Sequence, residues 1–278
     1  IIYPLFDSLI LSFFSWPGVG SRTFVGFKNF QTLFTGSYAK ELFNAFLHNV
    51  YFFLLLILLE LGLGFLIALM LASKIKGAGV FRVITYIPNM IPLVLVGFMW
   101  GLFLNPQVGL VNQLLKLVGL GGLAQPWLGL ENTALTTIIL VNVWRNLGFY
   151  VLVILAAILD ISPDLIEAAY IDGANNWKIT WRIIFPLTFS TFRTLAILLF
   201  IWSFNIFDTV YALTGVQAGP YRSTDVLGTL FYRTAFGGLG SGAVDMGLGA
   251  SVTVFIFMIV MPVSILYVYL VEKRQRSA

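Results

Sequence analysis

The sequence contains no cysteine, a single histidine (His48) and few charged residues. The absence of cysteine excludes a disulfide framework, a cysteine-ligated zinc site and a thiol nucleophile. One histidine excludes a multi-histidine metal site, so we expect no metal site in this chain. No stretch fits G-x-x-x-x-G-K-[ST], the phosphate-binding loop of many ATPases. The chain is therefore not expected to be an ATPase itself, and we expect no catalytic residues.

Charged residues make up only 10% of the 278 residues, whereas 59% are hydrophobic, and the mean hydropathy is +0.94. A soluble domain carries about a quarter charged residues. The apolar residues here fall into blocks of about twenty, the length that crosses a hydrocarbon core of about 30 Å. The composition therefore predicts an all-α, polytopic membrane protein in a lipid bilayer. We expect one domain over 1–278 with six transmembrane helices, at about 1–16, 49–73, 83–104, 133–159, 187–213 and 247–271.

Lysine and arginine predict the orientation of these helices. One set of loops holds eight of them in about 44 positions, and the other set holds six in about 88. Because cytoplasmic loops are enriched in Lys and Arg, we expect the N- and C-termini in the cytoplasm and residues 105–132 and 214–246 outside. The chain starts without Met or a basic flank, so we expect further residues upstream.

The most polar stretch between two apolar blocks is "EAAYIDGANNWKITWRIIFP", residues 167–186. Ser162 is a suitable N-cap and Pro163 a suitable first residue for a short cytoplasmic helix. Gly173 can end that helix in the left-handed conformation. Helix physics alone leaves two readings open, a helix that docks into a groove of another protein or an ordinary helix on the bilayer surface.

The spacing Glu167-Ala168-Ala169, three residues, Gly173, nine residues, Ile183, one residue, Phe185-Pro186 resembles the cytoplasmic signature of ABC-importer permeases. Phe185 replaces the usual Leu. Further stretches are similar to the carbohydrate-uptake permeases that resemble the larger maltose-permease subunit. These stretches are "WRNLGF" (144–149), "ISPDLIEAAYIDGA" (161–174), "FNIFDTVYALTG" (204–215) with "GP" (219–220), and Pro4, Ser8, Ser12 and Phe13.

The resemblance implies a type I ABC-importer permease fold in a bacterial inner membrane. It implies that residues 163–173 form the coupling helix, whose Glu167, Ala168, Ala169 and Gly173 would contact a cytoplasmic ATPase subunit. The expected partners are two ATPase subunits, which would bind ATP and Mg²⁺, a second homologous permease subunit and an extracytoplasmic solute-binding protein. The solute would be a sugar or oligosaccharide, and no nucleic-acid partner is expected.

Two predicted spans carry polar stripes that could line the solute path. Polar groups inside a membrane span are costly unless they face partners or water, and saccharide sites combine hydrogen-bonding side chains with aromatic faces. The resemblance points to the same two helices. Alternatively, these groups bond one another, for instance Arg145 with Asp208 or Glu60. The candidate substrate-binding residues are Asn142, Arg145, Asn146 and Phe149 in the fourth span and Trp202, Asn205, Asp208 and Thr209 in the fifth.

Other functions remain as alternatives. An ABC importer of a non-sugar or acidic solute, such as glycerol phosphate or a uronate oligosaccharide, is the closest one. An ion-coupled secondary transporter would normally show buried carboxylates and an inverted repeat, and no repeat is visible here. An intramembrane serine hydrolase using Ser251 and His48 lacks a third group that would orient the pair.

Overall fold

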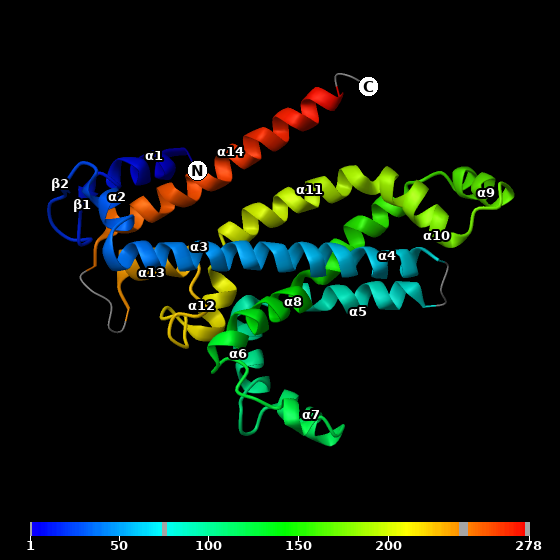
Figure 1. Ribbon diagram of the computed structural model, residues 1–278, viewed down its shortest axis with the longest axis horizontal. Coiled ribbons are helices and arrows are strands. Elements are labelled where there is room, and N and C mark those ends of the chain that lie inside the picture. Colours follow the sequence, from blue (N-terminus) through cyan, green and yellow to red (C-terminus); the bar gives the residue numbers. More distant parts are fainter. Residues whose placement is uncertain (1, 74–76, 239–243, 276–278) are drawn as a thin grey trace. The chain divides into compact units, whose positions relative to one another are not determined.

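The computed structural model describes residues 2–73, 77–238 and 244–275, and its elements are almost all helices (Figure 1). Two two-residue strands pair antiparallel, with Phe14 opposite Phe24. The elements are α1 (Ile2–Leu11), β1 (Phe14–Ser15), β2 (Thr23–Phe24), α2 (Lys28–Leu33), α3 (Gly36–Leu56), π-helical η1 (Ile57–Leu63), α4 (Gly64–Ala72), α5 (Ala78–Met90), α6 (Leu93–Phe103), α7 (Leu110–Leu117), 3₁₀-helical η2 (Gly121–Leu123), α8 (Glu131–Leu159), α9 (Pro163–Ile171), α10 (Asn176–Ile179), π-helical η3 (Thr180–Ile184), α11 (Phe185–Phe204), α12 (Asp208–Thr214), α13 (Leu227–Phe236) and α14 (Met246–Gln275).

Four continuous helices among the described residues are long and apolar enough to cross a membrane. They are Gly36–Ala72, Glu131–Leu159, Asn176–Phe204 and Met246–Val271. Helices α5 and α6 together form a fifth candidate that is bent at a break. Helix α1 has ten residues, fewer than the twenty or so that a crossing needs. The count of six spans therefore stays a prediction.

The third predicted span, 83–104, is not one continuous helix. Helix α5 ends at Met90 and α6 begins at Leu93. Between them Ile91 has an extended backbone, with φ −74° and ψ 128°. Proline disfavours the helical conformation in the residue before it, so Pro92 accounts for the break.

The second and fifth spans begin earlier than predicted, at Gly36 and Asn176. Residues 36–48 were expected in the loop before the second span, which was predicted to begin at about residue 49. They are helical because the same stretch buries Leu42 and Ala45, three residues apart on one helix face. The fifth helix also ends early, at Phe204, so the predicted span 187–213 is interrupted before α12.

The chain divides into two compact units. The first comprises residues 1–53, 92–139 and 200–278. In it, α1, α2 and α13 lie against α14, and α6 against α12 (Figure 1). Asp245 caps the start of α14, because its carboxylate accepts hydrogen bonds from the backbone N–H of Gly247 at 2.8 Å and the hydroxyl of Ser15 at 2.6 Å. The core of this unit contains Leu33, Leu42, Ala45, Phe204, Leu227, Leu230, Leu248 and Val252.

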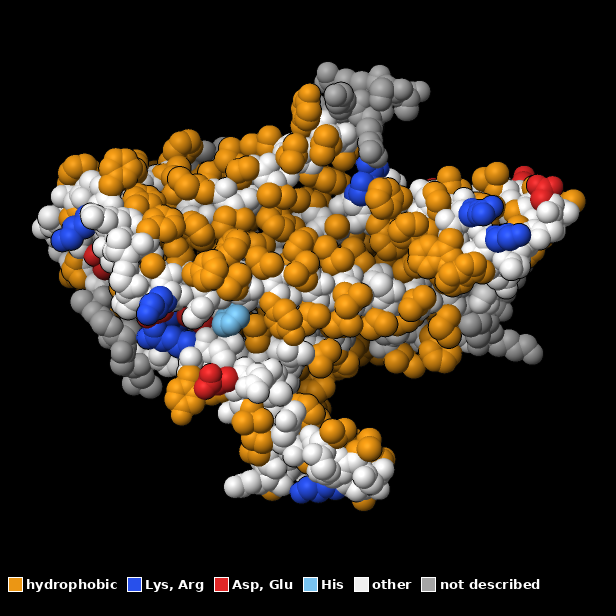
Figure 2. Space-filling model, viewed as in Figure 1, with side chains coloured by type: hydrophobic (Ala, Val, Ile, Leu, Met, Phe, Trp, Pro, Cys, Tyr) orange, Lys and Arg blue, Asp and Glu red, His pale blue; other side chains and the backbone are white. Residues whose placement is uncertain are grey.

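The second unit comprises residues 54–91 and 140–199. Helix α4 packs against α8 at Gly64, where an added Cβ would be in ordinary van der Waals contact, at 3.5 Å, with the side chains of both Tyr150 and Ile154. Phe65, on the next residue, sits among the rings of Trp181, Phe185 and Phe192 at centroid distances of 5.3–6.0 Å. Figure 2 shows hydrophobic side chains over α3 and α14 and charged side chains at α9 and α10. This distribution is typical of helices that meet lipid.

Candidate functional site

Helix α9 occupies the predicted cytoplasmic stretch, and both of its ends are closed by local hydrogen bonds. At the start, the Ser162 hydroxyl accepts from the backbone N–H of Asp164 at 3.3 Å, and Pro163 is the first helical residue. At the end, Gly173 has φ +79°. The N–H of Gly173 donates to the carbonyl of Tyr170 at 3.0 Å, and that of Ala174 to the carbonyl of Ala169 at 2.9 Å. This pair of bonds is the Schellman motif, which ends helices at a left-handed glycine.

The surface of α9 is open. None of its nine residues is buried, and Glu167, Ala168 and Gly173 are exposed. A Cβ added to Gly173 would meet nothing within 4 Å. Ile171 is 86% exposed, which is unusual for so large an apolar side chain. Three of the four predicted coupling residues thus lie on a short, well-capped helix that presents both an acid and apolar groups, and the fourth, Gly173, ends it.

A second cap fixes the helix that follows. The Asn175 side chain accepts from the backbone N–H of Lys178 at 2.9 Å and so caps α10. The Tyr170 hydroxyl donates to the side-chain oxygen of Asn176 at 2.8 Å, which ties α9 to α10. The turn between the two helices is therefore specified by its own residues.

The fourth-span stripe lies on α8, in the second unit. Asn142 is buried, and its amide donates to the Glu60 carboxylate at 3.3 Å. Arg145 donates to the side-chain oxygen of Asn146 at 3.4 Å, and Asn89 donates to the same oxygen at 3.2 Å. In the second unit Asn142, rather than Arg145, therefore reaches Glu60. Phe149 packs edge-on against the neighbouring Tyr150.

Glu60 itself was not among the predicted site residues. It is fully buried in the π-helical segment η1, beside Tyr150. A carboxyl inside an apolar span was visible in the sequence, and such residues mark functional or structural polar clusters. The π-helical geometry, which is frequent at functional sites, had no signal in the sequence.

The fifth-span stripe lies in the first unit. Its spacing in the sequence predicted one shared helix face, but the residues do not lie on one helix. Trp202 is on α11, Asn205 lies in the link after α11, and Asp208 begins α12. The Asn205 amide donates to the carbonyl of Ile201 at 2.8 Å and so satisfies the end of α11. Thr209 is buried. The prediction of a common helix face is therefore wrong, because the helix breaks between Phe204 and Asp208.

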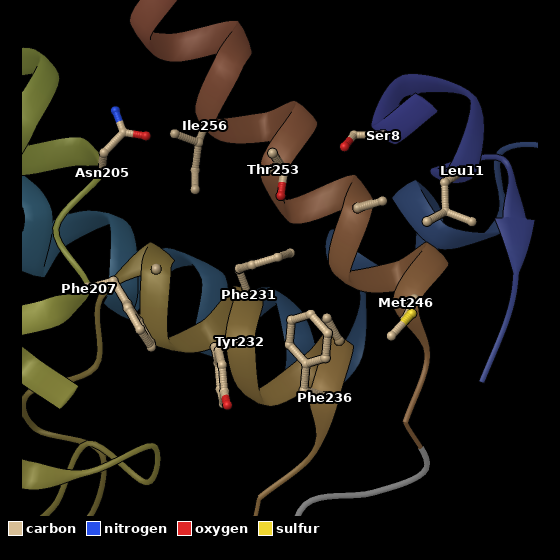
Figure 3. A pocket seen from close by; sticks show the side chains of 13 residues that line it. Ser8, Leu11, Asn205, Phe207, Phe231, Tyr232, Phe236, Met246, Thr253 and Ile256 are labelled. Carbon is tan, nitrogen blue, oxygen red and sulfur yellow. The ribbon is translucent and has the colours of Figure 1, made fainter. Parts of the chain in front are cut away.

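Of these residues, Asn205 lines a pocket in the first unit (Figure 3). The other residues around it come from α1, α13, α14 and the link before α12. Sequence reasoning missed the α13 side chains among them because 214–246 was read as loop, whereas α13 in that stretch is a helix with seven buried residues. The lining comprises Ser8, Leu11, Asn205, Phe207, Gly228, Phe231, Tyr232, Ala235, Phe236, Met246, Ala250, Thr253 and Ile256.

A buried ion cluster holds α13 to α3. Arg233 contacts both oxygens of Asp225, at 2.5 and 3.0 Å, and also reaches Glu41. Glu41 forms a second ion pair with Arg222. Burial alone would lower the pKa of the Arg233 guanidinium, but the hydrogen bond and charge of Asp225, helped by Glu41, outweigh it and raise that pKa. Arg233 is thus a structural cation rather than a loop charge.

Residues 60–277 match the family described as "Binding-protein-dependent transport system inner membrane component". The starch degradation products permease protein AmyD of Thermoanaerobacterium thermosulfurigenes is 29% identical over 99% of this chain and 89% of its own length. The trehalose/maltose permease protein MalF of Thermococcus litoralis is 31% identical, over 90% of this chain and 80% of its own.

A solved structure also resembles the chain throughout its length. It is a bacterial ABC transporter involved in the import of the acidic polysaccharide alginate, with a TM-score of 0.82 and 24% identity, covering 98% of this chain and 90% of that one. At this identity the likeness shows the fold, which is that of an ABC-importer permease. Taken with the family match over most of the sequence, it follows that this chain belongs to the family of binding-protein-dependent transport system inner membrane components.

Proposed function

We propose that this chain is a permease subunit of an ATP-driven ABC importer that carries a sugar or oligosaccharide across the bacterial inner membrane. Relatives that match most of the chain are described as permeases for starch degradation products and for trehalose and maltose, which supports the solute class. The family description supports a binding protein as the donor of the solute. The chain would be a transport subunit without catalysis of its own, with both termini in the cytoplasm.

The observation that carries the proposal is the open helix α9, which is capped at both ends, holds Glu167, Ala168 and Ala169, and is followed by the left-handed Gly173. Because its small residues leave room for close approach and its apolar residues are uncovered, α9 suits insertion into a groove of another protein. We assign that groove to a cytoplasmic ATPase subunit, which would hold the ATP and Mg²⁺. Movement of the ATPases would then be transmitted through α9 to the spans.

A single α9 serves one ATPase subunit, so a two-ATPase importer needs a second permease. We assign this place to a homologous but different chain. The solute would pass along polar residues of α8 and the α11–α12 link, among them Asn142, Asn146 and Asn205. Arg145, a cation on the same stripe, favours an acidic solute as the second candidate.

The test is to purify the complex from the native membrane through a tag on this chain and to reconstitute it. We expect one copy of this chain, one of a related permease and two ATPase subunits. ATP hydrolysis should rise when solute-loaded binding protein is added. A complex in which this chain is present twice would contradict the heterodimer, and isolation without any ATPase would contradict the importer.

A further inference from the structure

The pocket around Asn205 has a volume of about 430 Å³, within the range of about 300–1,000 Å³ that is usual for small-molecule sites. It is built entirely within the first unit. Its wall combines α1, the α11–α12 link, α13 and α14, which are far apart in the sequence (Figure 3).

One side of the pocket is aromatic. The rings of Phe207 and Tyr232 are stacked, with centroids 5.2 Å apart and planes at 27°. Phe236 continues this row, 5.1 Å from Tyr232, and Phe231 adds a further ring on the same helix. Aromatic side chains offer large apolar areas, so the row gives this side of the pocket an apolar surface that suits the apolar face of a sugar ring.

The other side carries a few polar groups. Figure 3 shows Ser8, Thr253 and Asn205 approaching from three different elements, opposite Phe231 and Phe236. The Asn205 amide nitrogen already donates to the carbonyl of Ile201, which leaves its side-chain oxygen to accept from a ligand. The hydroxyls of Ser8 and Thr253 are able both to donate and to accept. A ligand with several hydroxyl groups would match this set.

The thirteen lining residues include no Asp, Glu, Lys, Arg or His. A carboxylate or phosphate bound here would lose water without gaining a counter-charge, which is costly. We therefore propose that this pocket binds a glycosyl unit of a neutral saccharide, with the ring against the aromatic row and the hydroxyls toward Ser8, Asn205 and Thr253. This inference rests on the proposed sugar importer and decides between its neutral and acidic solutes.

The absence of cysteine makes a direct binding test possible. In the complete importer in lipid nanodiscs, with its binding protein, the alkylation rate of Thr253→Cys by N-ethylmaleimide is measured against added trisaccharides. The neutral probes are maltotriose, cellotriose, raffinose and N,N′,N″-triacetylchitotriose, and the acidic probe is trigalacturonic acid. We expect at least one neutral probe to slow alkylation at least threefold and the acidic probe to have no effect. Leu117→Cys, on exposed α7 in the same unit, is the control whose rate should not change.

A second pair of variants tests the contact itself. Thr253→Val keeps the side-chain shape but removes the hydroxyl, so KM for uptake of the protecting sugar should rise about threefold to tenfold, as for one lost hydrogen bond, with kcat unchanged. Thr253→Ser restores a hydroxyl and should restore KM. A KM that is unchanged in Thr253→Val would overturn the proposal, since the pocket would then lie off the solute path.

The outcomes separate this inference from the proposed function. If neutral sugar is taken up but no neutral probe protects position 253, the pocket assignment fails alone. Equal protection by trigalacturonic acid overturns the neutral class. If the second permease subunit or added lipid slows alkylation of position 253 without any sugar, the pocket is a subunit or lipid contact. That result also overturns the proposal. If sugar does not stimulate ATP hydrolysis by the importer, both the proposed function and the proposed sugar site are contradicted.

Discussion

At the end of α9, Gly173 combines a backbone that only glycine adopts easily with a surface that no neighbour covers. Its φ is +79°, and a Cβ would meet nothing within 4 Å. A substitution there acts through the backbone and through whatever docks on the helix. The effect of a larger residue is therefore a measure of docking once the backbone strain has been accounted for.

We expect Gly173→Val to weaken ATPase association and to abolish most uptake. A β-branched residue in the left-handed region costs about 1–3 kcal/mol, which would unwind the end of α9. Gly119→Val is the matched control, because Gly119 has φ +80° and equally open space but lies after α7. Co-purification of the ATPase with each variant is the measurement. Equal ATPase recovery from both variants would show that α9 is only a surface helix.

Glu167→Ala should act in the same direction but more mildly. Exposed ion pairs contribute about 0–1 kcal/mol, and Glu167 is exposed. Raising the salt concentration should narrow the difference from the unmodified importer, because salt screens surface charges. The readout is ATP hydrolysis per complex as a function of salt, and a salt-independent defect would exclude a surface ion pair.

Arg233 and Arg222 differ in what their loss should cost. Removing one partner of a buried ion pair leaves an uncompensated charge and costs about 3–5 kcal/mol, whereas an exposed pair is worth about 0–1 kcal/mol. Arg233 is 3% exposed and faces Asp225, whereas Arg222 is 39% exposed and faces Glu41. The midpoint temperature of thermal denaturation in detergent should therefore fall markedly for Arg233→Met and little for Arg222→Met. Similar midpoints would place Arg233 in solvent.

At the scale of elements, α6 and α12 approach each other closely at one glycine. A Cβ on Gly97 would lie 2.6 Å from the Cβ of Ala212 and 2.8 Å from its carbonyl oxygen. Gly97→Ala should therefore separate the two helices and destabilise the first unit by about 1–3 kcal/mol, the usual cost of overpacking. Gly101, one turn further along α6, has nothing within 4 Å of a Cβ, so Gly101→Ala is the control. Protease resistance of the two variants in detergent distinguishes them, and equal resistance would contradict the packing.

Local sequence signals made α9 predictable, whereas the breaks in the longer helices could not be located from such signals. Ser162 and Gly173 lie within a residue or two of the bonds that they organise. Pro92 was visible too, but a membrane span can accommodate an internal proline, and only the extended backbone of Ile91 reveals the break. The sequence around Asn205 contains no signal that α11 ends there.

The location of α13 was harder still, since it depends on tertiary partners. Arg233 reads as a loop cation when Asp225 and Glu41 are not known to surround it. Helix α13 also carries Leu230, which is fully buried. The candidate site could thus be predicted where it rests on neighbouring residues, and it could not where distant elements such as α1 and α14 complete the pocket.

For the whole molecule, single cysteines in this cysteine-free chain should report its orientation. Leu117→Cys on α7 should react with an impermeant maleimide added outside intact cells, because Leu117 is 81% exposed. Lys178→Cys on exposed α10 should react only after the membrane is opened. Leu230→Cys should stay unlabelled on both sides, since its side chain is buried. Labelling of position 117 only from the cytoplasm would reverse the proposed topology.

The uncovered apolar residues of α9 and α10 also bear on the life of the protein in the cell. Leu165, Ile171 and Trp177 are each more than half exposed at the end of the molecule proposed to face the cytoplasm. Until an ATPase covers them, they resemble the apolar segments by which chaperones and proteases recognise incomplete proteins. The supply of ATPase would then set how many permease subunits survive, so that synthesis of one subunit in excess need not leave idle channels in the membrane.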